Sequence, residues 1–294
     1  TNNDIMRLFL KKGISITLLD QKPAEKLGAI YTELQQAGVQ FELGPTYLDH
    51  LERYDVVFRA PGMYYNHPKL QEARQNGVVI TTEMEVFLEF CPCRCYAVTG
   101  SDGKTTTTTL ISEFFQESGV TVHKGGNIGR ALLPIIETIQ ENDVAVVELS
   151  SFQLLSMRQS PDVAVITNIA PNHLDVHGTM EEYIAAKTNI IAHQNAFSRT
   201  VLNLDNALTK NLSSMVRGTL FYFSRTQQPK WGTMLREDGM LCMCCNGVIT
   251  PVIHKDDIRI PGMHNVENYL AAIAAVWGEV PVSAIQNVAR QFGG

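Results

Sequence analysis

The feature that most constrains the fold is the stretch AVTGSDGKTTTTTL, Ala97–Leu110, where an apolar run enters a glycine-rich turn followed by a lysine and five threonines. A strand that passes through such a loop into a helix directs backbone N–H groups and the helix dipole at one point, which suits an anion. Because Val98 stands where the usual pattern has its first glycine, this is a shortened G-x-x-G-K-T form. The alternative is a purely structural turn. We predict a phosphate-binding loop, formed by Gly100, Ser101, Asp102, Gly103, Lys104, Thr105 and Thr106.

Composition and charge narrow the class of protein. The chain has 294 residues, 45% of them hydrophobic, which is enough apolar material for two domains. Its formal net charge of −6 argues against a broad basic face for nucleic acid. It shows neither an apolar run of the roughly 18 residues that a membrane span needs nor a basic-then-apolar leader. We therefore expect a cytoplasmic monomer that acts on small molecules, away from nucleic acid and membranes.

The six cysteines fall in two clusters, Cys91-Cys93-Cys95 and Cys242-Cys244-Cys245. The C-x-C-x-C spacing of the first cluster lacks the C-x₂-C step of zinc knuckles, and it leads into a strand. We expect free thiols in a reducing cytosol, with a metal site or a disulfide as the alternative.

The first ninety residues alternate helix and strand signals, which is typical of a parallel sheet covered on both faces. Strands are expected at 14–20, 41–43, 55–62 and 78–82, and helices at 3–12, 27–37, 67–77 and 83–90. We predict a Rossmann-like domain over residues 1–92. Such a sheet usually opens with a central strand and a glycine-rich turn, whereas this chain starts at the helix, so we expect the domain to be N-terminally incomplete. Asp20 stands where a ribose-contacting carboxylate would lie, although alone it reads as a surface or capping residue.

A second α/β unit begins at Arg94, and we predict a P-loop ATPase-like central domain over residues 93–294. Strands are expected at 95–100, 143–150, 162–170 and 200–206, and helices at 110–118, 180–193, 265–277 and 282–292. Residues 215–260 read as β-rich and irregular.

Polar side chains follow the strands of this second unit. Glu148 ends the apolar run DVAVVELS, so it is delivered to the ligand edge of the sheet, where phosphoryl-transfer enzymes hold a metal or position water. His173, Asp175 and His177 follow the next strand. Lys187 lies in an Ala-Ala-Lys run on a helix, where the alternative is an ordinary surface lysine.

These motifs, in this order, resemble the Mur ligase family, the ATP-dependent amide ligases of peptidoglycan precursor synthesis. The resemblance covers nearly the whole chain, and the segments GGNIG, ELSSFQL and RAPGMYYNHP look most like the members that add D-glutamate. The matching segments are Thr99–Thr105 (T-G-x-x-G-K-[TS]), Gly126–Gly129 (G-N-I-G), Glu148–Ser151 (E-x-S-S), Asn168–Asp175 (N-[IV]-x-x-[DN]-H-[LM]-D), Ala185–Lys187 (A-x-K) and Gly262–Asn268 (G-x-H-N-x-x-N).

The resemblance implies that ATP phosphorylates the carboxylate of UDP-N-acetylmuramoyl-L-alanine and that the amine of D-glutamate attacks the acyl phosphate. Lys104 and Thr105 would hold the ATP phosphates. One Mg²⁺ would bind Thr105 and Glu148, and a second would bind His173 and Lys187, the lysine being carboxylated to a carbamate. The remaining roles would be adenine contact by Asn265 and Asn268, and contact with the UDP-linked substrate by Asp20, Pro61, Gly62, Asn127 and Ser150.

The family's C-terminal domain, which binds the incoming amino acid, has no counterpart in this sequence, so we expect a fragment that binds nucleotide without turning over. Other hypotheses are a sibling Mur-type or folate-polyglutamating ligase, a non-catalytic nucleotide-binding module, and a P-loop NTPase switch. The presence of Glu148, His173 and Lys187 favours an enzyme over a non-catalytic module. A switch would carry Asp-x-x-Gly after its second strand, where this chain has Glu-Leu-Ser-Ser.

Overall fold

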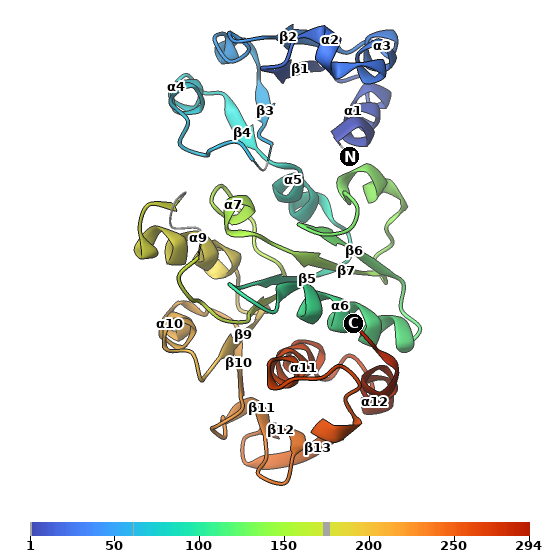
Figure 1. The fold of residues 1–294 in the computed structure, drawn as a ribbon, viewed down its shortest axis with the longest axis vertical. Helices are drawn as coiled ribbons and strands as arrows, with labels where there is room; N and C mark the ends of the chain where they lie inside the picture. The colour runs from blue at the N-terminus through green and yellow to red at the C-terminus, as the bar shows by residue number, and fades with distance from the viewer. Residues whose placement is uncertain (1, 61, 173–176) are drawn as a thin grey trace.

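The computed structural model describes residues 2–60, 62–172 and 177–294 (Figure 1). The predicted α/β class is confirmed: one large sheet runs from the middle of an elongated molecule to the end that carries β12 and β13, and small parallel strand pairs lie at the opposite end. Among the described helices, none is both long and apolar enough to cross a membrane.

The N-terminal strands pair in parallel, as the sequence pattern predicted, and they form two pairs. β1 pairs with β2 and β3 pairs with β4, both in parallel. A cavity of about 1140 Å³ lies between β1 and β3, lined mainly by apolar side chains such as Phe9, Leu18 and Phe58. The elements of this part are α1 (Asn2–Lys11), β1 (Thr17–Asp20), α2 (Ala24–Leu27), α3 (Ala29–Gln36), β2 (Gln40–Leu43), η1 (Leu51–Arg53), β3 (Val56–Phe58), α4 (Pro68–Gln75), β4 (Val79–Thr81) and α5 (Glu83–Phe90).

The rest of the chain builds a nine-stranded sheet in the order β13-β12-β11-β10-β9-β8-β5-β7-β6. In this spatial order, the seven strands from β11 across to β6, which include β5, run parallel to one another. β12 and β13 add an antiparallel edge. The sequence pattern missed β6, because its residues VHKGG carry no apolar run. The strands are β5 (Arg94–Thr99), β6 (Val122–Gly126), β7 (Val144–Glu148), β8 (Val163–Ile166), β9 (Arg199–Asn203), β10 (Thr219–Ser224), β11 (Trp231–Leu235), β12 (Met240–Cys245) and β13 (Val248–His254).

Helices cover both faces of the large sheet, so alternate residues of its strands enter two different cores. Tyr96 and Val98 of β5 pack with the first group of helices, and Cys95 and Ala97 pack with the second. The first group is α6 (Lys104–Glu117), α11 (Met263–Val276) and α12 (Val282–Gln291), and the second is α5, η2 (Leu133–Thr138) and α9 (Met180–Ala192). Shorter helices are α7 (Ser151–Leu154), α10 (Ala207–Asn211), η3 (Leu212–Met215) and η4 (Lys255–Asp257).

The helix after the phosphate loop starts earlier than the apolar pattern indicated. It begins at Lys104, whereas we expected a helix over 110–118. The threonine run therefore belongs to its first two turns, and the side chains of Thr107 and Thr108 are fully buried. The helix N-terminus consequently lies at the loop itself, which is the arrangement an anion site requires.

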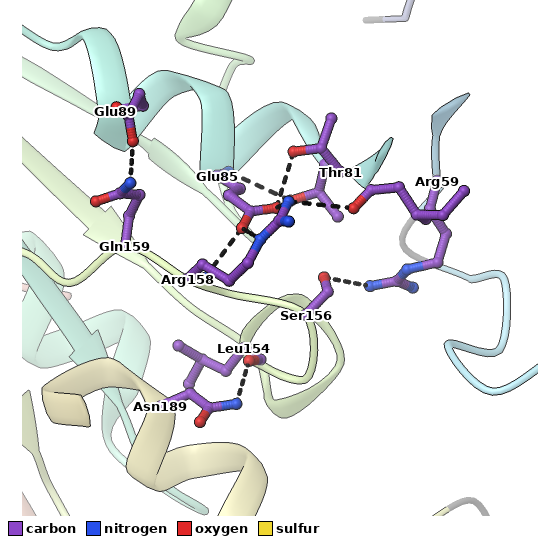
Figure 2. Close-up of polar contacts among 11 residues, drawn as sticks. Arg59, Thr81, Glu85, Glu89, Leu154, Ser156, Arg158, Gln159 and Asn189 are labelled. Atoms are coloured by element: carbon purple, nitrogen blue, oxygen red, sulfur yellow. Dashed lines mark hydrogen bonds and ion pairs between the residues drawn. The ribbon is translucent and has the colours of Figure 1, made fainter. Parts of the chain in front are cut away.

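Polar contacts join the N-terminal part to the segment around α7 (Figure 2). Arg59, which follows β3 and is only 4% exposed, donates to the Phe152 carbonyl oxygen at 2.9 Å and to Ser156 Oγ at 3.3 Å. Arg158 binds the buried Glu85 of α5, with Nε 2.7 Å from Oε1. These side chains hold the N-terminal part against the central domain.

We expect Arg59→Ala to lower the free energy of unfolding by about 2–4 kcal/mol, because buried acceptors on both sides of this contact lose their donor. Chemical denaturation measures the change. Arg53→Ala is the matched control: its side chain is 59% exposed and its ion pair with Glu42 spans 3.8 Å, so its loss should stay within about 0.5 kcal/mol. Equal losses in the two variants would contradict the role given to Arg59.

Candidate functional site

Three neighbouring strands deliver the candidate site residues to one edge of the large sheet. β5 lies between β7 and β8 and runs parallel to both. Because parallel strands end at the same edge, the phosphate loop after β5, Glu148 at the end of β7 and the segment 167–170 after β8 come together there. The prediction that Glu148 lies beside the phosphate loop is confirmed.

The segment after β8 fixes the shape of the phosphate loop. Thr167 Oγ1 donates to the Asp102 carbonyl oxygen at 2.6 Å, and Asn168 Oδ1 accepts from the Asp102 N–H at 3.0 Å. Ser101 is also held by this segment. Its N–H donates to the Asn168 carbonyl oxygen at 2.9 Å, and its Oγ donates to the Ala170 carbonyl oxygen at 2.9 Å. Sequence reasoning gave no role to Thr167 or Asn168, although Asn168 opens a quoted motif. These contacts hold the loop ready for a ligand.

Gly103 and Asn268 pack closely, so a Cβ at position 103 would push the Asn268 amide out of place. Gly103 has φ +77°, and a Cβ there would lie 2.3 Å from Asn268 Oδ1. Asn268 is buried and accepts from Thr107 Oγ1 at 3.3 Å, and its Nδ2 donates to Asn265 Oδ1 at 3.2 Å. The structure therefore places Asn268 behind the loop as a support.

We expect Gly103→Ala to lower the free energy of unfolding by about 2–4 kcal/mol, because backbone strain and the contact with Asn268 add together. Gly119→Ala is the matched control, since Gly119 has a similar φ of +86° and nothing within 4 Å of its Cβ position. Gly119→Ala should lower the free energy of unfolding by about 1 kcal/mol, from backbone strain alone. Urea denaturation of both variants tests this, and indistinguishable losses would contradict the contact.

Two lysines lie on the backbone of the loop. Lys104 Nζ donates to the Ser101 carbonyl oxygen at 2.8 Å. Lys187, from α9, donates to the Gly100 carbonyl oxygen at 2.8 Å, and its Nζ lies 4.7 Å from the centre of the Tyr183 ring. Two lysine side chains therefore flank a loop that also lies at a positive helix N-terminus.

Lys187 is only 2% exposed, which excludes the ordinary surface lysine considered from the sequence. Burial, reinforced by the nearby charge of Lys104, lowers the pKa of Lys187 to about 7. A large share of this side chain is therefore a neutral amine near neutral pH. Neutral amines are nucleophiles, and protonated ones are not.

Glu148 is buried and joins two loops through its carboxylate. Its Oε2 accepts from Thr105 Oγ1 at 2.6 Å, and its Oε1 accepts from Asn127 Nδ2 at 2.8 Å. Gly126 permits this approach, because a Cβ there would lie 2.2 Å from the Glu148 carbonyl oxygen. Thr105, Glu148 and Asn127, taken from three separate motifs, therefore form one oxygen-rich cluster.

The remaining predicted residues lie in simpler settings or outside the described residues. Ser150 caps α7 and accepts from the Gln153 N–H at 3.3 Å. Asn265 donates to the Pro261 carbonyl oxygen at 2.6 Å, Asp20 accepts from the Lys22 N–H at 2.8 Å, and Gly62 is exposed. The predicted site residues Pro61 and His173 lie outside the described residues, as does Asp175.

His177 contacts α7 and α9, where its ring also packs edge-on against Tyr183. Its Nε2 lies 2.9 Å from Ser151 Oγ, and its ring stacks on Phe152. Within the part of the chain that the structure describes, no group of three or more His, Cys, Asp and Glu side chains is arranged to hold a metal.

The large cavity connects the N-terminal strands with the Asn127 loop. It is lined by Leu18, Arg59, Gly126, Arg130 and Gln153, among others. Gly126, which directly precedes Asn127 in the chain, is part of this lining. Sequence reasoning did not select Arg59 or Gln153. Only their position in the fold shows that they line the cavity.

Comparison with known proteins agrees with this geometry. The model of the Mur ligase middle domain matches residues 98–276. The chain is 45% identical over 294 residues to UDP-N-acetylmuramoylalanine–D-glutamate ligase of Ruminiclostridium cellulolyticum and 45% identical to the enzyme of the same name from Acetivibrio thermocellus, and it spans 63% of the length of each. In fold, it is similar to UDP-N-acetylmuramate:L-alanyl-gamma-D-glutamyl-meso-diaminopimelate ligase from Neisseria meningitides, with 16% identity, a TM-score of 0.62, and coverage of 99% of this chain and 94% of that one.

Proposed function

The chain belongs to the Mur ligase family, and on that premise we propose that it acts in the ATP-dependent ligation of D-glutamate to UDP-N-acetylmuramoyl-L-alanine, in peptidoglycan precursor synthesis. The observation that carries this proposal is the meeting of the phosphate loop, Glu148 and Lys187 at one sheet edge. The relatives named for D-glutamate ligation favour that amino acid over the others that the family adds.

In this proposal the two parts of the chain bind different substrates. Residues 1–92 hold the UDP-linked substrate, with Asp20, Pro61 and Gly62 contributing from strand ends and loops. Residues 93–294 hold ATP, and Asn127 and Ser150 receive the muramoyl-alanine end. The cavity between β1 and β3 is lined in part by Gly126, Gly129 and Arg130, which supports a substrate path from the N-terminal part to the Asn127 segment.

The residues present fit ATP and Mg²⁺. Carboxylate and hydroxyl oxygens are ligands that Mg²⁺ prefers, and Glu148 and Thr105 already lie 2.6 Å apart. Lys104 and the N–H groups at the start of α6 suit the phosphates, and Asn265 and Asn268 are the residues we assign to the adenine side. Glu148 and Thr105 would hold the ion, and Mg²⁺ bound there would supply positive charge beside the phosphates.

Lys187 is proposed to carry a carbamate that, with His173, holds a second Mg²⁺. A protonated lysine would be repelled by a nearby metal ion, whereas a carbamate supplies oxygen ligands. Burial supports the neutral amine that reacts with CO₂, because it lowers the pKa of Lys187 to about 7. Tyr183 and the Gly100 carbonyl oxygen fix the direction of the side chain.

The residues of this chain contribute mainly by holding the reactants in place. A carboxylate is a poor acceptor for an amine, and phosphorylation converts it to a mixed anhydride with a good leaving group. The transfer therefore needs orientation and charge stabilisation more than covalent help from the protein. Thr167 and Asn168 keep the loop in shape, so its N–H groups need little rearrangement when phosphate binds.

Phosphate release by the full-length protein tests the proposal. The protein is given ATP, Mg²⁺ and UDP-N-acetylmuramoyl-L-alanine together with a panel of amino acids. D-glutamate should be the amino acid that stimulates phosphate release and appears in the product. Stimulation by a different amino acid would assign the protein to a sibling ligase, and ATP binding without any release would favour a non-catalytic module.

A further inference from the structure

The first cysteine cluster lies where α5 leads into β5, away from the phosphate loop. Cys91 is the C-cap of α5, and its N–H donates to the Phe87 carbonyl oxygen at 2.9 Å. Its Sγ lies 3.5 Å from that of Cys93, and all six cysteines of the chain are free thiols. Cys91 is half-buried and Cys93 is 5% exposed. One accessible thiol is therefore in contact with one protected thiol.

A histidine and an aspartate lie near these thiols. Cys95, Ala145 and His123 occupy one register row across β5, β7 and β6, so their side chains share a face of the sheet. The residue between them is an alanine, which leaves space. His123 Nε2 lies 2.8 Å from Asp143 Oδ2, and within the described residues its buried Nδ1 has no hydrogen-bond partner.

This environment favours a thiolate at Cys91. A hydrogen bond from the Cys93 thiol, whose sulfur lies 3.5 Å away, lowers the pKa of Cys91 and outweighs the opposing effect of burial. The same contact raises the pKa of Cys93, because its proton is held by the neighbouring sulfur. The two thiols therefore differ in protonation. Cys91 is the better nucleophile, and Cys93 stays protonated until the exchange step in which it attacks Cys91.

The second cluster provides an internal comparison. Cys245 is half-buried like Cys91, but burial raises its pKa. Cys242 and Cys244 are buried on β12, and burial raises their pKa values as well. Thiols with raised pKa values are poor nucleophiles near neutral pH. The same molecule thus carries one activated cluster and one inert cluster.

We propose that Cys91 and Cys93 form a redox-active dithiol that undergoes exchange with small-molecule disulfides of the glutathione type. The Cys91 thiolate attacks one sulfur of the disulfide, whose S–S bond breaks and releases the first small thiolate. The Cys93 sulfur, on losing its proton, then attacks Cys91 and releases the second. The protein pair loses two electrons and the Cys93 proton, and the small disulfide leaves as two thiolates, one of which takes that proton while the other is protonated by water.

Alkylation rates test the first half of the proposal. The folded protein is treated with limiting iodoacetamide at pH 7, and each cysteine is followed by peptide mass spectrometry. Cys91 should react on the order of tenfold faster than Cys245, which has similar exposure. Equal rates at these two positions would overturn the proposal.

Oxidation by glutathione disulfide tests the second half. The wild-type protein should form the Cys91–Cys93 disulfide and retain no glutathione. Cys93→Ser should stop at a stable glutathione adduct on Cys91, and Cys95→Ser should still form the disulfide. Thermal unfolding confirms that each variant is folded, and Cys245→Ser controls for the loss of a thiol. A lasting glutathione adduct on the wild-type protein, or no adduct on Cys93→Ser, would overturn the assignment of Cys93 as the resolving thiol.

Discussion

Lys104→Ala in the full-length protein is expected to reduce ligation by at least about 10²-fold while the protein remains folded. The side chain lies at the start of α6 with its Nζ on the Ser101 carbonyl oxygen, where it can turn to the ATP phosphates. Loss of one preorganised charge at a site of developing negative charge typically has an effect of this size. Phosphate release under saturating substrates measures it, and thermal unfolding checks the fold.

Lys210→Ala is the matched control, because Lys210 is an exposed lysine on α10, outside the candidate site. It should leave phosphate release unchanged. Near-normal release by a folded Lys104→Ala variant would contradict the assignment of the loop.

Lys187→Ala is expected to be nearly inactive, and small carboxylates should restore part of the rate. The buried side chain leaves a space beside Gly100 that acetate or formate can enter, supplying the oxygen atoms that a carbamate would supply. Lys187→Arg keeps the positive charge but cannot form a carbamate, so it should stay inactive. The rate of phosphate release is measured for the wild-type protein and for both variants.

A second measurement separates the carbamate from a simple charge effect. Wild-type protein in ¹³C-labelled bicarbonate should show a carbamate carbon signal by NMR, and Lys187→Arg should lack it. An active Lys187→Arg variant, together with no rescue of Lys187→Ala, would mean that only the charge matters at this position.

Much of the candidate site could be predicted from local sequence. The glycine-rich loop, Lys104 and Thr105 are adjacent in the chain, so a short motif is enough to define an anion site. Glu148 was predictable because an apolar strand that ends in an acid places it at the sheet edge. The resemblance to the Mur ligase family drew attention to Lys187, whose neighbours in sequence are alanines and give no hint of its partner.

The contacts that hold this site together were not predictable from the same motifs. Thr167 and Asn168 bind Asp102 across about 65 positions of sequence, and such contacts depend on β8 lying next to β5. Asn268, which the resemblance assigns to the adenine, also lies behind Gly103, and its motif gave no sign of that contact. The burial of Lys187 likewise depends on how α9 packs against the sheet.

By itself, the sequence determined the α/β class, most of the strands, the glycine-rich turn between β5 and α6, and the family, because each depends on patterns within a few neighbouring residues or on motif order. Only the tertiary structure decided which strands pair. The N-terminal strands form two separate pairs, and β6, which lacks an apolar run, completes the large sheet. Strand pairing brings together hydrogen-bonding edges that lie far apart in the chain, and every strand offers similar backbone groups. Local pattern therefore identifies the strands, and packing of the whole chain decides their neighbours and the geometry of the site.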